Sequence, residues 1–569
     1  MNFRKILKWF LITTGVLSIA LVIFVTFFLK GILVNKLTRE LKHTFGNYYT
    51  LKYSSIETSV GLNGLTITIQ KPTFTSDTSL HELNEKFPAL FFKSNVLKID
   101  NISVYKLLFT HDIELKQILL KKPSLKLVTF TRDTTELKEE PASKKKSEKN
   151  LTNFLYIKKI SIEKGNVVTC NAGDKTDTTF LGINIGVNVE NIAVHTSKLK
   201  SLAYALEDKN NFQFSVEKAY YKPYQANYLF FMDSLELDDR TKTISAHNLS
   251  ESTLKSKHEI SQKSRFSKVI AETKIGYFKA SGYNKKQFFL YNTIRLHSMQ
   301  LEKIDLELFR NKRKQLDVNN EKMALQEMLT GFPFSLVIDT IRIKNFNLTF
   351  ELIDHRTKTP VEFSLDGINI LLANINTIPG TRDTMVLLCN GKFMNAAAFK
   401  MNLFFPDIHK ADSYYNGYIG PMPFLTFNPI LASYSGIQVV SGQIQSVVFS
   451  GRCNKYENFG SLVFTYKDLE IEVNKKSDNG EKKKGKLVTM LGNMLLNRNN
   501  PVSDDEAPRK QTYYFKREKY QSDIVLWIGG IMEGVKNTLV DKDVQEKGKT
   551  FMKNKKKRDK KTALSKAEK

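Results

Sequence analysis

The residues that come closest to a catalytic motif lie in a lysine-rich stretch near residue 480. Gly480, Gly485 and Lys486 have the spacing of a P-loop, in which the backbone N–H groups of a glycine-rich turn surround phosphate oxygens. A P-loop also needs a serine or threonine hydroxyl on Mg²⁺ at the next position, where this chain has Leu487. We therefore interpret the stretch as a basic surface loop and expect no nucleotide cofactor.

Cysteine and histidine residues do not form a recognisable reactive site. Cys170, Cys389 and Cys453 each fall in or beside a β-like stretch, which favours a packed thiol over a nucleophile. The nine histidines are scattered, and the chain contains no HExxH, CxxC or GxSxG sequence. No carboxylate pair stands out from the polar faces of the expected strands. We therefore expect no catalytic, cofactor-binding or metal-binding residue and predict that the protein is not an enzyme.

The longest uncharged segment runs from Trp9 to Leu29. Its 21 residues lie between Lys8 and Lys30, and as a helix they would span roughly 30 Å, the thickness of a bilayer core. A cleaved signal peptide has a shorter apolar run followed by small residues. The segment predicts an uncleaved membrane anchor with a cytoplasmic amino terminus, because basic residues crowd the short leader. The anchor residues at its two ends are Trp9, Phe10, Leu11, Phe27, Phe28 and Leu29.

Most of the chain after the anchor is predicted to form β-strands. Apolar residues alternate with polar ones, which is typical of strands with one apolar face. The following residues lie on such faces and are our candidates to line an apolar groove: Leu65, Ile67, Ile69, Ile183, Ile185, Val187, Leu469, Ile471 and Val473. Several strands carry aliphatic residues at positions 1, 4 and 6, as in Ile99, Ile102 and Val104, which suggests a bulge or bend.

Helices are expected at both ends of the β-body. The spacing of apolar residues from Val34 to Phe45 predicts a short amphipathic helix that ends at Gly46. Two further amphipathic helices are predicted, from Leu487 to Leu495 and from Ile524 to Leu539. The second contains Trp527 and either closes the end of the β-body or lies in a membrane interface. The polar stretch 250–268 is expected to be a solvated loop.

Two halves of the chain look duplicated. LYIKKISIEKGNVV from Leu155 aligns with LVIDTIRIKNFNLT from Leu336, and a Gly-Ile-Asn strand follows each segment. We divide the chain into a cytoplasmic stub and anchor (1–30), amino-terminal helix and strands (31–132), a polar linker (133–150), a first β-repeat (151–330), a second β-repeat (331–475), a basic loop with amphipathic helices (476–548) and a disordered basic tail (549–569).

Charge favours an anionic partner. The chain has 86 Lys and Arg against 58 Asp and Glu, a net charge of +28, and the last 21 residues hold ten of the basic residues against two acids. Next to an anchor, anionic lipid explains such a tail better than nucleic acid does, because each basic residue near the lipid adds about 1 kcal/mol. A merely solubilising tail is the alternative. We expect no nucleic-acid partner.

Taken together, these segments resemble the AsmA-like family of diderm bacterial envelopes. The resemblance rests on the anchor, the helix ending in Gly, the strand ending at Pro72, the Leu120–Leu125 segment and a carboxy-terminal block around Phe427-Asn428-Pro429, Gly442-Gln443-Ile444 and 460–473. It is a hydrophobic pattern over most of the chain and transfers no catalytic residue. It implies a single-pass inner-membrane protein with a periplasmic body, a chorein-like start and a curved sheet related to bridge-like lipid-transfer proteins.

The predicted fold is therefore mainly β: an elongated, curved antiparallel sheet, open or taco-like, with an amino-terminal transmembrane helix and carboxy-terminal amphipathic helices. The function that we expect is binding or movement of phospholipid in an apolar groove that supports envelope or outer-membrane homeostasis. The alternative is a scaffold for outer-membrane assembly with a closed β-sandwich core and assembly proteins as partners. Alternation alone leaves both open, because an apolar face is covered either by another layer of protein or by acyl chains.

Overall fold

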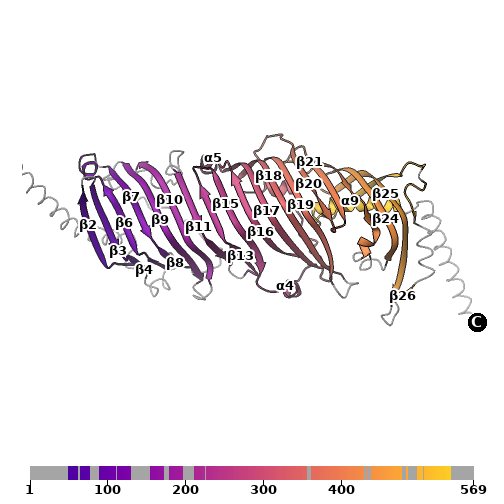
Figure 1. Ribbon diagram of the computed structural model, residues 1–569, viewed down its shortest axis with the longest axis horizontal. Coiled ribbons are helices and arrows are strands. Elements are labelled where there is room, and N and C mark those ends of the chain that lie inside the picture. Colours follow the sequence, from indigo (N-terminus) through magenta and orange to yellow (C-terminus); the bar gives the residue numbers. More distant parts are fainter. Residues whose placement is uncertain are drawn as a thin grey trace, which may run out of the picture. The chain divides into compact units, whose positions relative to one another are not determined.

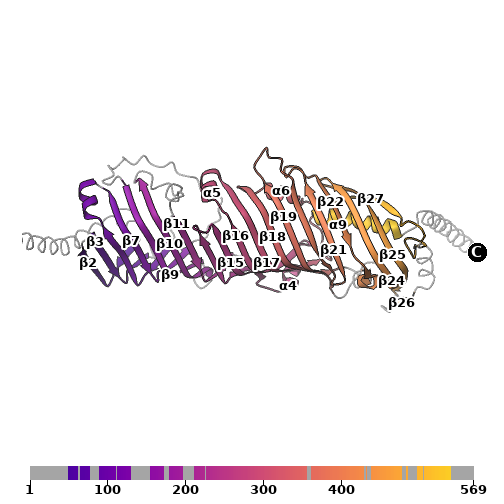
Figure 2. The same ribbon diagram turned by 45° about the horizontal axis from the view of Figure 1, so that its top comes forward.

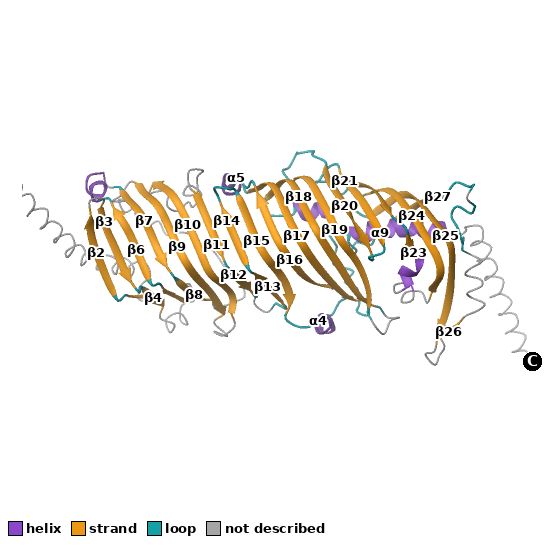
Figure 3. Cartoon of the chain, viewed as in Figure 1, coloured by secondary structure: helices purple, strands orange, loops and turns teal. Residues whose placement is uncertain are grey.

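A computed structural model describes most of the chain between residues 49 and 539. The described residues are 49–61, 64–76, 89–110, 112–129, 154–171, 178–195, 211–223, 226–354, 360–428, 431, 437–476, 482–484, 496–503 and 505–539. Among them the protein is mainly β, with 65% in strands and four helices (Figure 3). The chain divides into two compact units, residues 1–251 with 279–291 and residues 252–278 with 292–569.

The first unit is built from short and long strands that are hydrogen-bonded side by side. Its strands are β1 (Tyr49–Lys52), β2 (Ser55–Gly61), β3 (Gly64–Gln70), β4 (Thr73–Ser76), β5 (Ala89–Lys93), β6 (Val96–Ile102), β7 (Ile113–Lys121), β8 (Ser124–Thr129), β9 (Phe154–Asn171), β10 (Thr178–His195), β11 (Asn211–Val216), β12 (Lys218–Tyr221), β13 (Tyr228–Met232), β14 (Ser234–Asp238) and most of β15 (Thr243–Thr253). Hydrogen bonds join β2, β3, β6, β7, β9, β10, β11, β14 and β15 in this order. Figure 1 shows most of this row, and Figure 3 also labels β14.

A crease crosses the strands of this unit where short strands end or long strands bend. Non-glycine residues with positive φ stand at this level on one strand after another: Lys71 (45°), Lys122 (49°), Lys164 (54°), Asn184 (52°) and Asn248 (48°). Left-handed residues of this kind form β-bulges, which bend a strand and increase its twist. Because each strand bends at the same level, the sheet itself is creased.

The second unit repeats this construction with longer strands. Its elements include β16 (Val269–Ser281), β17 (Thr293–Asn311), β18 (Ser335–Ile353), β19 (Val361–Asn376), β20 (Met385–Phe393), β21 (Ala397–Phe405), β22 (Ser413–Ile419), β23 (Met422–Pro423), β24 (Ile437–Cys453), β25 (Glu457–Lys476), β26 (Lys482–Lys484) and β27 (Lys510–Lys516). From β17 to β22 each strand pairs with the next, β22 pairs with β24, β24 with β25, and β25 with β27.

The prediction of an antiparallel sheet holds only in part: the sheet is mixed, because three pairs of the described strands are parallel. Strand β9 runs parallel to β7 and to β8, and β18 runs parallel to β17. Parallel neighbours need a long connection, and two long connections are present. Residues 130–153, which include the polar linker predicted from the sequence, join β8 to β9, and residues 312–334 join β17 to β18.

The two segments that align in sequence have matching places in their units. Strands β9 and β18 each pair in parallel with the strand before them and antiparallel with the strand after them. The aligned residues Lys164 and Asn345 both adopt positive φ (54° and 53°). Two residues later, the side-chain oxygen of Asn166 accepts a hydrogen bond from the Asn184 backbone N–H, and that of Asn347 accepts one from the Gly367 N–H. The similarity therefore extends from sequence to backbone conformation.

Short helices lie at the ends of strands and one longer helix packs on the second unit. They are α4 (Lys257–Lys263), α5 (Lys285–Tyr291), α6 (Leu325–Thr330) and α9 (Asp523–Leu539), with a π-helical turn η1 (Lys106–Thr110) and a 3₁₀ turn η3 (Phe424–Phe427). The expectation of a solvated loop over residues 250–268 is wrong, because β15 continues into it and α4 follows. Ser256 and Glu259 form a capping box, and Ile260 is buried against Ile270 and Phe309.

The predicted helix from Ile524 to Leu539 is confirmed as α9. It packs on β25 and β27 (Figure 2). Asp523 at its start accepts a hydrogen bond from the Leu325 N–H (2.7 Å) and forms an ion pair with the buried Arg517 (3.1 Å). Burial raises the pKa of Asp523 above its ordinary value, because the hydrogen bond and Arg517 only partly compensate for the lost hydration of the carboxylate. The predicted helices at 34–45 and 487–495 lie outside the described residues.

Candidate functional site: an apolar face in each unit

One face of the first unit is lined by apolar side chains in cross-strand rows. The strand register places Ile56, Ile69, Leu97, Leu120, Ile162, Val187, Phe214, Leu237 and Ile244 opposite one another on successive strands. A second row on the same face contains Ile67, Ile99, Ile118, Ile160, Val189 and Phe212. Because neighbouring residues of a strand point to opposite faces, both rows lie on one side of the sheet.

The opposite face of these strands is polar. Thr66 donates a hydrogen bond to Asp100 (2.9 Å), and Ser161 donates one to Asn188 (2.8 Å). Arg240 forms an ion pair with Glu190 (2.7 Å), and its hydrogen bond lowers the pKa of that carboxyl below the ordinary value. The unit therefore has one polar face, which water can solvate, and one apolar face.

The second unit has an equivalent apolar face. One row contains Leu301, Ile343, Ile370, Cys389, Met401, Gly417, Phe449 and Leu462, each paired with the next across β17 to β25. The neighbouring row contains Met299, Ile341, Leu372, Leu387, Leu403 and Tyr415. The first four residues of this row are half-buried, whereas Leu403 and Tyr415 are buried.

Helix α9 covers the β24 to β27 end of this face. The Asn458 side chain accepts a hydrogen bond from the Tyr415 hydroxyl and donates one to the Leu526 carbonyl of α9, both 2.9 Å long. The Tyr415 and Tyr513 hydroxyls are 2.7 Å apart. Burial raises the pKa of Tyr513 to about 12 and that of Tyr415 further still, so both phenols stay neutral and hold the network. Protein thus closes one end of the face.

The described strands of each unit belong to one hydrogen-bonded sheet. A sandwich has two separate sheets packed face to face, about 10 Å apart. The half-buried residues of β17 to β20 therefore lie in a single hydrogen-bonded layer of strands.

The candidate groove residues from the sequence fall into different environments. Leu65, Ile67 and Ile69 lie on the apolar face of β3 and are at most 8% exposed, and Leu469 and Ile471 of β25 are also buried. Ile183, Ile185 and Val187 of β10 are half-buried. The side chain of Val473 lies outside the described residues.

The strict alternation expected from Ile183 to Val189 is wrong. The register of β10 against β9 shifts between Gly182 and Val187, and Asn184 has positive φ there. Val187 and Val189 belong to the apolar rows, whereas Ile183 and Ile185 lie at the crease. A β-bulge adds a residue and so breaks the two-residue period on which the expectation depended. The bulge residues Asn101 and Asn191, by contrast, do fall inside copies of the 1, 4, 6 pattern.

Sequence reasoning missed the half-buried residues of the second unit, among them Met299, Ile341, Leu372 and Leu387. Met299 and Ile341 each occupy the middle position of a 1, 4, 6 pattern of aliphatic residues, so the sequence did contain a signal for these two. Leu371 and Leu372 of β19, and Leu387 and Leu388 of β20, are adjacent leucines, and adjacent residues do not reveal which one faces which side. Only the register assigns Leu372 and Leu387 to the apolar face.

The remaining sequence expectations lie beyond the described part of the chain. Among the described residues, no helix has both the length and the hydropathy needed to cross a membrane. The expected anchor, Trp9–Leu29, is outside those residues, as are the basic tail and the side chains of the near-P-loop.

The three thiols sit in the β-structure. Cys170 and Cys453 are buried and Cys389 is half-buried. Burial raises the pKa of Cys389 to about 11 and is the main cause that raises that of Cys453 to about 12, which disfavours the reactive thiolate at neutral pH. The described residues contain no group of three or more His, Cys, Asp or Glu that could hold a metal ion.

In comparisons with known proteins, no protein-family model, no curated protein and no solved structure matches the chain.

Proposed function

We propose that the protein binds phospholipid acyl chains on the apolar faces of its two units and helps to move lipid in a bacterial envelope. The observation that carries this proposal is the row of half-buried apolar residues Met299, Ile341, Leu372 and Leu387, which lies on one face of a single hydrogen-bonded sheet of described strands. The polar opposite face lets such a sheet stand in water while its apolar face holds lipid.

The hydrophobic effect provides the driving force. Removing apolar surface from water contributes about 0.8 kcal/mol for each buried CH₂ group of an acyl chain. Covering the surface that these half-buried side chains still expose adds less than about 1 kcal/mol for each of them. An acyl chain needs no hydrogen-bond partner, so it can lie against Leu, Ile and Met side chains without an unsatisfied polar group.

The cellular setting completes the proposal. The resemblance to AsmA-like proteins and the segment Trp9–Leu29 support a single-pass protein anchored in the inner membrane, with its amino terminus in the cytoplasm and its body in the periplasm. The basic tail, 549–569, would then add attraction to anionic lipid. Outer-membrane homeostasis is the process that this arrangement serves.

The alternative of an assembly scaffold rests on a closed sandwich core. Its apolar faces would be buried by protein, and its partners would be outer-membrane assembly proteins. The described strands belong to one hydrogen-bonded sheet and not to two separate ones, which favours lipid over a closed sandwich, so lipid binding is the function that we argue.

Adjacent leucines on β20 provide a sharp test. Leu387 lies on the apolar face and Leu388 on the opposite face, and both are half-buried. A photo-crosslinking amino acid placed at residue 387 of the full chain, in growing cells, should capture phospholipid that mass spectrometry detects. The same group at residue 388 should capture little.

The substitution Leu387→Glu should also remove most phospholipid that co-purifies with the full chain, because a carboxylate on the apolar face must be desolvated by acyl chains. Leu388→Glu is the matched control and should retain the lipid. Equal lipid capture at both positions, or equal lipid content in both variants, contradicts the proposed function.

A further inference from the structure

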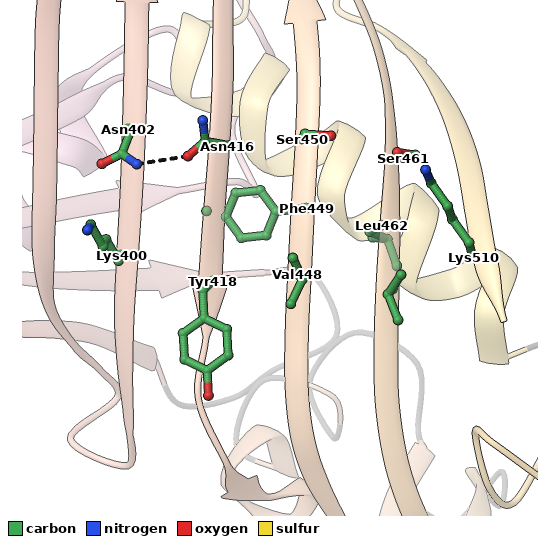
Figure 4. Close-up of a pocket in the computed structure, with 12 residues that line it drawn as sticks. Lys400, Asn402, Asn416, Tyr418, Val448, Phe449, Ser450, Ser461, Leu462 and Lys510 are labelled. Carbon is green, nitrogen blue, oxygen red and sulfur yellow. Dashed lines mark hydrogen bonds between the residues drawn. The ribbon is translucent and has the colours of Figure 1, made fainter. Parts of the chain in front are cut away.

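The face opposite α9 in the second unit carries a surface pocket of about 420 Å³ that the acyl-chain proposal does not use. Two adjacent rows of side chains line it across five strands, β21, β22, β24, β25 and β27. Gly417, Phe449 and Leu462, which belong to the apolar row on the other face, complete the lining between these two rows. One row is polar and contains Asn402, Asn416, Ser450 and Ser461. The other row contains Lys400, Tyr418, Val448, Val463 and Lys510. Figure 4 shows these side chains on neighbouring strands, with α9 behind them (Figure 4).

Several polar groups of the pocket lack a partner. Asn402 donates a hydrogen bond to the Asn416 side chain (2.8 Å), but its own side-chain oxygen is buried and accepts no hydrogen bond. Among the described residues, neither the Lys400 nor the Lys510 ammonium has a carboxylate within ion-pair distance, and the pocket lining contains no acidic residue. The Asn402 oxygen is closed to an outside ligand, whereas the Lys400 and Lys510 ammonium groups are exposed, so a ligand with negative charges would be stabilised here.

The spacing of these groups indicates the shape of the ligand. Neighbouring strands are about 4.8 Å apart, so Lys400 and Lys510 are separated by four strand spacings, on the order of 19 Å. The polar row offers an amide or hydroxyl group at each strand between them. Tyr418 is 41% exposed and Val448 is 49% exposed, and they form an apolar strip beside that row. The site therefore suits an extended chain that has hydroxyl groups along one edge, apolar C–H faces and negative charges.

We propose that this pocket binds an anionic oligosaccharide. Sugar hydroxyls exchange hydrogen bonds with Asn416, Ser450 and Ser461, while sugar C–H faces rest on Tyr418 and Val448. The acidic groups meet Lys400 and Lys510. Each sugar ring is about as long as one strand spacing (~4.8 Å), so the row of side chains matches the repeat of the ligand. The inference goes beyond acyl-chain binding, because it uses the other face of the sheet.

Titration calorimetry on the purified full chain tests this inference with tetragalacturonate as the probe and cellotetraose as its neutral counterpart. Tetragalacturonate should bind the wild-type chain, and cellotetraose should bind more weakly. The double variant Lys400→Gln/Lys510→Gln should weaken tetragalacturonate binding at least about tenfold, because two charge-assisted contacts are lost. Tyr418→Ala should weaken binding of both probes.

Lys392→Gln on β20 is the matched control, because Lys392 is exposed but lies outside the pocket lining. It should leave binding unchanged, which excludes attraction to the net positive charge alone. Failure of the wild-type chain to bind tetragalacturonate, or an equal loss in Lys392→Gln and in the double variant, overturns the inference. Lipid capture at residue 387 should persist in the double variant, so the two proposals fail independently.

Discussion

At the scale of the residue, the crease depends on single positions where a non-glycine residue adopts positive φ. Lys164 and Asn345 occupy matching positions in the two aligned segments, and the asparagine two residues later holds the neighbouring strand through its side-chain oxygen. Asparagine tolerates the left-handed conformation better than most residues do, whereas a β-branched side chain is strained there. These positions therefore matter for backbone conformation rather than for burial.

Substitution of Asn345 separates these effects. Asn345→Val should destabilise the second unit by about 1–2 kcal/mol, because a β-branched residue is forced into the left-handed region, whereas Asn345→Gly should be close to neutral. Urea unfolding followed by the fluorescence of Trp527, in a Trp9→Phe background, measures the change. Thr349→Val on the same strand is the control, since valine suits an ordinary strand position. Equal stability of Asn345→Val and Asn345→Gly would disprove the strain at the crease.

At the scale of the element, α9 approaches the sheet closely because small residues face it. Gly530 packs against Asn458 and Tyr513, and Gly534 against Leu462 and Tyr513. A Cβ atom at residue 534 would lie 2.5 Å from the Leu462 Cδ2 atom. The exposed side of the helix carries Ile528 and Met532, so it remains apolar as well. The helix thus covers one end of the apolar face and presents an apolar surface of its own.

Gly530→Ala should loosen this packing. Helix propensity alone favours alanine by about 1 kcal/mol, but Asn458 is fully buried and held by two hydrogen bonds, so the added methyl group displaces the helix and costs about 1–3 kcal/mol. Hydrogen exchange of the α9 amides should become faster. Met532→Ala, at an exposed position of the same helix, should change exchange little. Slower exchange in Gly530→Ala would mean that propensity outweighs packing.

At the scale of the whole molecule, lipid should act as a missing layer of the fold. If acyl chains cover the apolar faces, phospholipid binds the folded chain in preference to the unfolded chain and stabilises it by about 2–3 kcal/mol at roughly a hundredfold excess over Kd. The thermal midpoint of the delipidated full chain should therefore rise as short-chain phospholipid is added. Leu387→Glu should respond less than Leu388→Glu. A midpoint that is independent of phospholipid in the wild-type chain contradicts a lipid layer.

Local patterns in the sequence predicted individual strands and helices better than they predicted which strands pair with one another. Alternation predicted β3 through Leu65, Ile67 and Ile69, and helical spacing predicted α9 through Ile524, Ile528 and Ile531, because each period depends only on nearby residues. The parallel pairing of β9 with β7 was missed, although the polar linker 133–150 supplies the long connection that it needs. The prediction of strict alternation from Ile183 onward failed because Asn184 adopts a left-handed conformation. This bulge interrupts the two-residue period, so Ile183 and Val187 do not belong to one regular alternating series.

The sequence by itself determined that this protein is mainly β, that its strands have one apolar side and that a helix at Ile524–Leu539 follows them, because these properties arise from the order of side chains along the backbone. Tertiary structure alone decided which apolar residues form common rows, that α9 covers one end of the apolar face, and that Lys400 and Lys510 bracket a polar row on the other side. Those relations depend on hydrogen-bond register between strands far apart in the chain, and a shift of one residue would move every side chain of a strand to the opposite face.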